Sequence, residues 1–221
     1  SARMLFEVLG DLWVVSRNPY LQDDLIENPK RFKQLVEAMR HRIKSIEDRS
    51  FGNIKVAQLT TAALAAILKF ELDFKNVKKL RKKVLSKLKR YTKKHNIQFD
   101  GLARVSHVTD ATDWRVEFPF VVINPDKESE ISHIVKACID LELTIIPRGG
   151  GTGYTGGAIP LIPTTAVINT EKLDEISAVV FKNLPGLSES VPTIRCEVGV
   201  VTRRAMDLAS DAGLEFATDP T

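Results

Sequence analysis

The stretch Pro147-Arg148-Gly149-Gly150-Gly151-Thr152-Gly153-Tyr154-Thr155-Gly156-Gly157 decides how the second half of this chain folds, because six of its eleven residues are glycine. Glycine adopts positive φ angles at no steric cost and lets the main chain approach a ligand closely. Consecutive N–H groups in such a turn can converge on an anion. We interpret the stretch as a phosphate-binding loop. A flexible linker is the alternative, and the apolar segments on both sides of the loop disfavour it.

The sequence around the loop alternates between strand and helix patterns. Residues 120–123 form a short apolar run between Pro119 and Asn124-Pro125, which predicts a buried strand. A helix follows, with apolar residues on one face and acidic residues near its positive N-terminus. Residues 143–146 are the next strand, and residues 166–168 form another one after the loop. Strand, helix and strand in this order predict a βαβ unit, which normally pairs its strands in parallel.

Two familiar phosphate-binding motifs are excluded. The loop contains no lysine, so it is not a Walker loop. Gly151-x-Gly153-x-x-Gly156 matches the Rossmann string, but that motif requires a helix to open within it. Here Pro160 and Pro163 follow, which makes a helix at this point strongly unfavourable.

These residues resemble the flavin pyrophosphate loop of FAD-linked oxidoreductases of the vanillyl-alcohol oxidase type, whose FAD-binding domain is called PCMH-type. The D-lactate dehydrogenase and glycolate oxidase branch is the most similar. The resemblance covers about residues 104–221. It is supported by six weaker segments: Asp110 to Arg115, Phe120 to Pro125, Glu130 to Val135, Ile168 to Asp174, Glu197 to Val200, where Val198 replaces the family's proline, and Phe216 to Thr221.

The resemblance implies a cofactor site made mostly of main chain. The N–H groups from Arg148 through Gly153 would bind the FAD diphosphate, and Thr152 could add its hydroxyl. In some relatives a histidine at the position of Thr152 holds FAD covalently, so we expect noncovalent FAD here. The expected cofactor-binding residues are Arg148, Gly149, Gly150, Gly151, Thr152, Gly153, Tyr154, Gly157, Ala158 (the last two near the flavin end), Gly199 (near the adenosine), Asp219, Pro220 and Thr221.

The sequence gives Arg148 two equally supported roles. It could neutralise a phosphate, or it could pair with a carboxylate and brace the loop. No catalytic acid–base pair and no metal-ligand cluster is evident. The family continues past this segment with another flavin-contacting stretch and a substrate domain, so we expect the chain to be an N-terminal fragment, inactive alone. The parent enzyme is expected to oxidise a 2-hydroxy acid such as D-lactate or glycolate and to pass electrons to an acceptor.

The first hundred residues are predicted to form a basic helical domain. They contain 22 Lys and Arg against 11 Asp and Glu, whereas residues 101–221 contain 10 against 17. This asymmetry indicates two modules, residues 1–100 and 101–221. Because the first module is predicted to be helical and the second to contain strands and helices, the fold class is predicted to be α+β. Asn28-Pro29 is typical of a helix start. Val77 to Lys94 is expected to be a helix with one apolar face and many lysines.

The basic helix Val77–Lys94 leaves three interpretations open. Its lysines could be a solvated face, could contact an anionic membrane surface, or could bind an acidic partner or nucleic acid. No Trp or Phe accompanies the lysines to insert into lipid, and no interleaved aromatic platform is present to stack with bases. The chain lacks a long apolar run and an evident signal peptide, and Cys138 and Cys196 form no motif, so we expect a cytoplasmic protein, with the inner membrane face as a peripheral site. The competing function is a non-catalytic module that binds another phosphate ligand.

Overall fold

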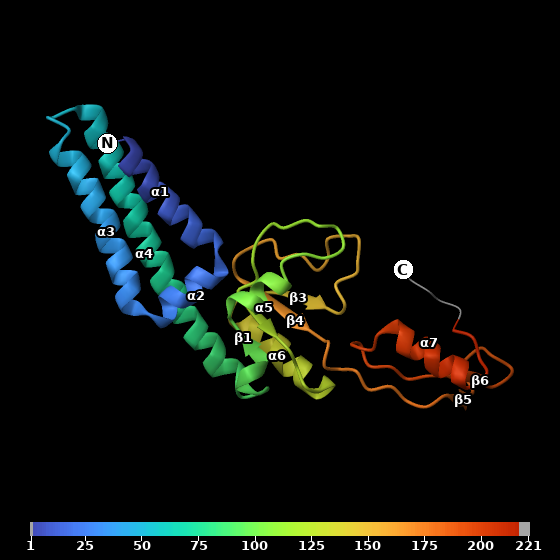
Figure 1. Ribbon diagram of the computed structural model, residues 1–221. Helices are drawn as coiled ribbons and strands as arrows, with labels where there is room; N and C mark the ends of the chain where they lie inside the picture. The colour runs from blue at the N-terminus through green and yellow to red at the C-terminus, as the bar shows by residue number, and fades with distance from the viewer. Residues whose placement is uncertain (1, 217–221) are drawn as a thin grey trace. The chain divides into compact units, whose positions relative to one another are not determined.

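The structure is a computed structural model that describes residues 2–216, and the chain divides into two compact units. The first unit comprises Ser1–Lys87 and Gln98–Ser106, and the second comprises Leu88–Ile97 and His107–Thr221. The expected α+β class, a helical N-terminal region followed by a mixed segment with strands, is confirmed (Figure 1). The boundary at residue 100 stays a prediction.

The first unit is helical. Its elements are α1 (Ala2–Arg17), α2 (Pro19–Glu27), α3 (Pro29–Asp48), α4 (Ile54–Leu88, which ends at the unit boundary) and α5 (Gly101–Ser106). The Asn28-Pro29 start is confirmed, with Pro29 at the first position of α3, where its missing N–H costs nothing. Helices α1, α3 and α4 share a core that includes Val8, Met39 and Ile67, each with no exposed surface (Figure 1).

The basic helix is shorter than the sequence predicts. Helix α4 ends at Leu88, whose carbonyl accepts hydrogen bonds from the N–H groups of Tyr91 (2.9 Å) and Thr92 (3.2 Å). The chain then turns through a short 3-10 helix, Lys94–Asn96. The expected continuous helix Val77–Lys94 is therefore wrong beyond Leu88. Within α4, Val84 and Leu88 are fully buried, as the apolar pattern predicts.

Within the described residues, the second unit contains α-helices α6 and α7, the 3-10 helix Lys94–Asn96, and the strands, except that Gln98 of β1 belongs to the first unit. The parallel part consists of β2 (Val121–Ile123), α6 (Glu128–Asp140), β3 (Thr144–Arg148) and β4 (Thr165–Asn169), and the short β1 (Ile97–Gln98) extends its sheet. Beyond these lie β5 (Val180–Lys182), which pairs antiparallel with β6 (Val191–Thr193), and α7 (Thr202–Asp211).

The sheet order is β1-β2-β4-β3, which corrects one detail of the βαβ prediction. Strands β2 and β3 are parallel but do not pair with each other, because β4 lies between them and pairs with both. Residues of β2 and β4 are buried along their whole length, which suits a central position in the sheet. The glycine loop therefore connects the edge strand β3 to the inner strand β4.

Candidate functional site

The glycine-rich loop lies between the end of β3 at Arg148 and the start of β4 at Thr165, and its residues 149–158 form neither helix nor strand. The absence of a helix agrees with the exclusion of a Rossmann site. Most of these residues are exposed, so a ligand can reach the main chain. Gly151 (φ 68°) and Gly156 (φ 73°) adopt the left-handed conformation that favours glycine.

The N–H groups of Gly149 through Gly157 donate to no carbonyl or side chain among residues 2–216. The first loop N–H with a main-chain partner is that of Ile159, which donates to the Gly156 carbonyl at 3.2 Å. A run of exposed donors without intramolecular acceptors is able to bind an anion. This is the feature that fits the diphosphate of FAD.

The space beside the glycines also suits a ligand. A Cβ added at Gly153 would meet no atom within 4 Å. At Gly149, Gly150 and Gly157 the nearest atoms would be 3.9, 3.6 and 3.4 Å away. No neighbouring protein group therefore requires glycine at these four positions, whereas close approach of a bulky anion would require it.

The guanidinium group of Arg148 lies next to Gly151 of the loop. Its Nη1 donates to the Thr109 carbonyl at 2.7 Å, and a Cβ on Gly151 would lie 2.2 Å from its Nη2. Burial lowers the pKa of the guanidinium, and the charge of Asp110 opposes that shift. Of the two roles left open by the sequence, this geometry favours bracing of the loop.

Asp110, the residue that follows Thr109, is buried. Its Oδ1 accepts hydrogen bonds from the Thr112 hydroxyl (2.6 Å) and the Thr112 N–H (2.9 Å). These two bonds are the main cause that lowers the pKa of Asp110, with smaller contributions from the Ala158 N–H and the Arg148 charge. The sequence marked residues 110–115 only through a family resemblance, and long-range packing places them against the loop.

Gly199 has a structural reason to be glycine. A Cβ there would lie 2.2 Å from the Thr170 carbonyl oxygen and 2.8 Å from that of Leu173. Its N–H also donates to the Leu173 carbonyl at 2.8 Å. Its expected approach to adenosine stays a prediction. Asp219, Pro220 and Thr221 lie outside the described residues.

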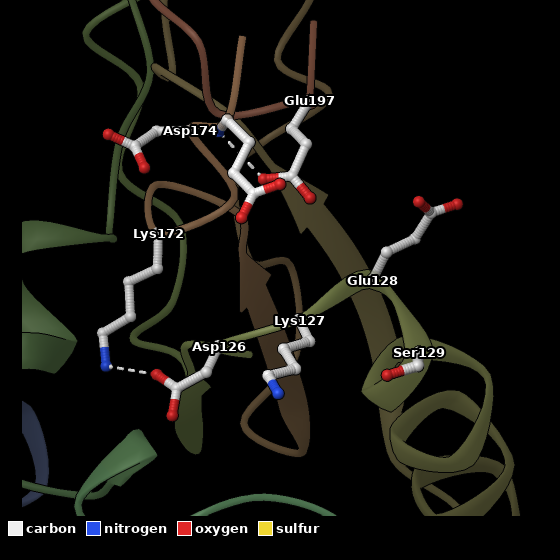
Figure 2. A pocket seen from close by; sticks show the side chains of 8 residues that line it. Asp126, Lys127, Glu128, Ser129, Lys172, Asp174 and Glu197 are labelled. Carbon is white, nitrogen blue, oxygen red and sulfur yellow. Dashed lines mark hydrogen bonds and ion pairs between the residues drawn. The ribbon is translucent and has the colours of Figure 1, made fainter. Parts of the chain in front are cut away.

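A separate polar pocket of about 620 Å³ lies in the same unit (Figure 2). Lys172 and Lys93 both bind Asp126, at 3.1 and 2.8 Å, and hold the pKa of Asp126 well below its usual range, Lys93 contributing most. The other lining residues are mainly acidic, which does not suit a diphosphate; they are Lys127, Glu128, Ser129, Asp174, Glu175 and Glu197. No group of His, Cys, Asp and Glu within residues 2–216 is arranged to hold a metal.

Two family models match successive parts of the chain. Residues 1–72 match a family described as "Protein of unknown function (DUF3683)", and residues 119–221 match one described as "FAD binding domain". No helix in the described range 2–216 has both the length and the apolar character needed to cross a membrane.

Two curated relatives are similar to part of the chain. The chain is 34% identical over 101 residues to a D-lactate dehydrogenase of Archaeoglobus fulgidus, a match covering 46% of this chain and 20% of that protein. It is 28% identical over 126 residues to the glycolate oxidase subunit GlcD of Bacillus subtilis, covering 57% of this chain and 25% of the relative. The match therefore spans a quarter or less of the length of either relative.

Among solved structures, alkyldihydroxyacetonephosphate synthase is 20% identical, with a TM-score of 0.49 over 62% of this chain and 28% of the other. A substrate-bound p-cresol methylhydroxylase is 17% identical, with a TM-score of 0.45 over 60% and 25%. The family match and the curated relatives confirm the resemblance carried by the glycine loop. Residues 119–221 therefore match an FAD-binding domain, as the glycine loop predicts.

Proposed function

We propose that the loop Arg148–Ala158 binds the FAD diphosphate through its main chain, and that the chain is the FAD-binding part of an oxidoreductase acting on a 2-hydroxy acid. The observation that supports the loop assignment is the run of N–H groups from Gly149 through Gly157, mostly in exposed residues, that have no acceptor in residues 2–216. The substrate class is supported by relatives named D-lactate dehydrogenase and glycolate oxidase.

The residues of this chain hold and orient the cofactor. Convergent N–H groups would stabilise the diphosphate charge, and the exposed Thr152 hydroxyl could add one donor. The redox chemistry, removal of a hydride from the substrate and delivery of electrons to a separate acceptor, is what the cofactor supplies when bound. Because Thr152 has no nucleophilic imidazole, we expect FAD to be bound noncovalently.

Gly150→Asp tests the loop assignment. The new carboxylate would stand where the diphosphate binds, so the intact protein should lose its flavin absorbance on desalting while keeping its unfolding midpoint. Ser188→Asp adds the same charge at an exposed residue outside the loop and should keep its flavin. Normal flavin content in Gly150→Asp would rule out the assignment.

The substrate class is tested separately, by anaerobic mixing of the flavin-loaded intact protein with D-lactate, glycolate or D-2-hydroxyglutarate. At least one of these acids should bleach the flavin absorbance, whereas L-lactate should do so more slowly. If none reduces the flavin while dithionite does, the 2-hydroxy acid assignment is wrong and FAD binding stands.

A second proposal concerns the helical unit, where one side of α4 is suited to an anionic surface. Leu64, Leu68 and Leu72 are exposed, and spacings of three or four residues continue this side into exposed lysines, namely Lys75, Lys79, Lys82 and Lys83. Other basic residues have structural partners: Arg81 binds Asp23 at 2.6 Å. The lysine segment lacks Trp and Phe, but the helical unit carries exposed Phe6 and Trp13 on α1.

We propose that this side of α4 makes peripheral contact with an anionic membrane, in a protein that otherwise resides in the cytoplasm. Sedimentation with vesicles tests it. Binding to vesicles containing phosphatidylserine should exceed binding to phosphatidylcholine alone and should fall with salt. Replacing Lys75, Lys79, Lys82 and Lys83 by Gln should abolish the difference. Equal binding by that variant would contradict the proposal, and capture by an acidic protein alone would favour a protein partner.

A further inference from the structure

Trp114 is an exposed aromatic residue beside the glycine loop. It is 67% exposed, and one of its ring carbons lies 3.8 Å from the position that a Cβ on Gly156 would take. A single exposed apolar residue is ordinary on a protein surface. This one, however, lies against the run Gly149–Gly157, whose N–H groups have no acceptor among residues 2–216. The indole is therefore next to the place proposed for the FAD diphosphate.

The segment that carries the indole, residues 109–117, is attached at both ends. At its start, Arg148 Nη1 donates to the Thr109 carbonyl at 2.7 Å. At its end, the Glu117 N–H donates to the Pro160 carbonyl at 3.1 Å. Both contacts lie at the borders of the glycine loop, so they hold this segment alongside the loop.

A tight turn directly precedes the indole. Asp110 is buried, and its Oδ1 accepts hydrogen bonds from the Thr112 hydroxyl (2.6 Å) and N–H (2.9 Å). The Thr112 hydroxyl oxygen also accepts from the Trp114 N–H at 3.4 Å. Asp113, between them, has a φ of 62°, a left-handed conformation that few residues other than glycine adopt. These contacts fix the main chain at Trp114, so the exposed indole has a defined position.

The chemistry of FAD explains what such an indole could contact. FAD carries a flat ring system on each side of its diphosphate, with isoalloxazine at one end and adenine at the other. A diphosphate held by the loop therefore brings a ring close to each border of the loop. An indole has a large apolar face that packs well on a flat ring. Trp114 lies beside Gly156, near the end of the run of N–H groups, where a ring would leave the loop.

We propose that Trp114 packs its indole against one ring system of the bound FAD and so contributes to cofactor affinity. This inference rests on the proposed binding of the diphosphate by the loop. Packing would remove part of the indole from water, and that burial of apolar surface adds to the attraction between the N–H groups and the diphosphate. The charge is held by the main chain, and the ring is held by Trp114.

The test measures the FAD dissociation constant of the intact protein by quenching of flavin fluorescence. Trp114→Leu keeps an apolar side chain but removes the ring, so it should weaken FAD binding by about fivefold or more. Trp114→Phe keeps a ring and should lose clearly less. Phe181→Leu is the matched control, because it removes a ring that is also 67% exposed but lies on β5, and it should bind FAD normally.

Two results of this measurement would overturn the proposal. One is FAD binding by Trp114→Leu within twofold of the parent, and the other is an equal loss in Trp114→Phe. Circular dichroism in the far ultraviolet checks that each variant folds. If Trp114→Leu does not fold, Trp114→Met decides by the same criteria.

Displacement of FAD by three probes shows whether a ring is involved, and which one. ADP contains adenine and the diphosphate, FMN contains isoalloxazine and one phosphate, and inorganic pyrophosphate contains no ring. Trp114→Leu should weaken the binding of ADP or FMN and leave pyrophosphate unaffected. A loss for FMN assigns the indole to isoalloxazine, and a loss for ADP assigns it to adenine. An equal loss for pyrophosphate would mean that Trp114 only supports the loop, and the proposal would fall.

Gly150→Asp distinguishes this inference from the loop assignment. If Gly150→Asp keeps its flavin, the loop does not bind the diphosphate and both ideas fail. If Gly150→Asp loses flavin and Trp114→Leu binds it normally, only the role of Trp114 is wrong.

Discussion

Gly199→Ala should lower the stability of the folded protein, whereas Gly153→Ala should leave it slightly more stable and weaken cofactor binding. At Gly199 a methyl group would lie 2.2, 2.8 and 3.1 Å from main-chain atoms of Thr170, Leu173 and Glu171. Main chain cannot move aside as a flexible side chain can. At Gly153 no atom lies within 4 Å of the added methyl.

The magnitudes follow from these contacts. Overpacking a tight site costs about 1–3 kcal/mol, and Gly199 stands at the upper end because its N–H also makes a 2.8 Å hydrogen bond to the Leu173 carbonyl. Replacing glycine by alanine recovers about 0.4–1 kcal/mol by restricting the unfolded chain. We expect Gly199→Ala to lose about 2 kcal/mol of unfolding free energy. Gly153→Ala should gain a few tenths and weaken FAD binding at least tenfold.

Urea unfolding of the FAD-free protein measures the first effect. Trp13 lies in the first, helical unit and Trp114 in the second unit, so a Trp13→Phe background leaves Trp114 to report on the unit that contains both glycines. Trp13 is 63% exposed, so this background change should be mild. An unchanged urea midpoint in Gly199→Ala would refute the close packing described for Gly199. Unchanged FAD affinity in Gly153→Ala would refute close approach of the cofactor at that glycine.

Three further predictions follow from individual residues. Gly10 lies within α1 with open space beside it, so Gly10→Ala should raise the unfolding free energy of the helical unit by about 0.5–1 kcal/mol, measured by thermal unfolding; a lower melting temperature would contradict this. The pKa of Asp126 is lowered in the folded state, mainly by Lys93, so its contribution to stability should be present above the ordinary pKa of 3.8 and be lost on acidification; Lys93→Met should flatten the acid branch of a stability–pH curve, and an unaltered branch would show that this ion pair is unimportant. Burial raises the pKa of the Cys138 thiol to about 11 whereas Cys196 is exposed, so a thiol reagent at pH 8 should label one cysteine quickly and the second only in denaturant; two fast thiols would show that α6 opens readily.

Several features of this protein could be predicted from the sequence because they depend on neighbouring residues. The strands 121–123, 144–148 and 165–169 follow from short apolar runs bounded by turn residues. The irregular loop follows from its glycines and from Pro160 and Pro163, which prevent a helix regardless of what surrounds them. The start of α3 at Pro29 is equally local.

Other features depend on contacts between residues far apart in the chain, so local patterns do not contain them. The place of β4 between β2 and β3 depends on which strands pair. The end of α4 at Leu88 could not be predicted, because the periodic apolar pattern continues to Tyr91 and indicates a longer helix.

For the candidate site, the loop whose N–H groups are the donors could be predicted from the sequence, whereas the contacts that hold this loop depend on the tertiary structure. The glycines that expose the main chain lie close together in the sequence, so the sequence alone identifies the loop. Arg148 left two roles open, and Asp110 was only part of a weak resemblance. Only folding brings Thr109 and the loop together, 39 residues apart at the Arg148–Thr109 hydrogen bond, and assigns the arginine to a main-chain carbonyl. The physical reason is that conformational freedom is a property of a residue and its neighbours, whereas burial and charge pairing exist only once distant segments have packed.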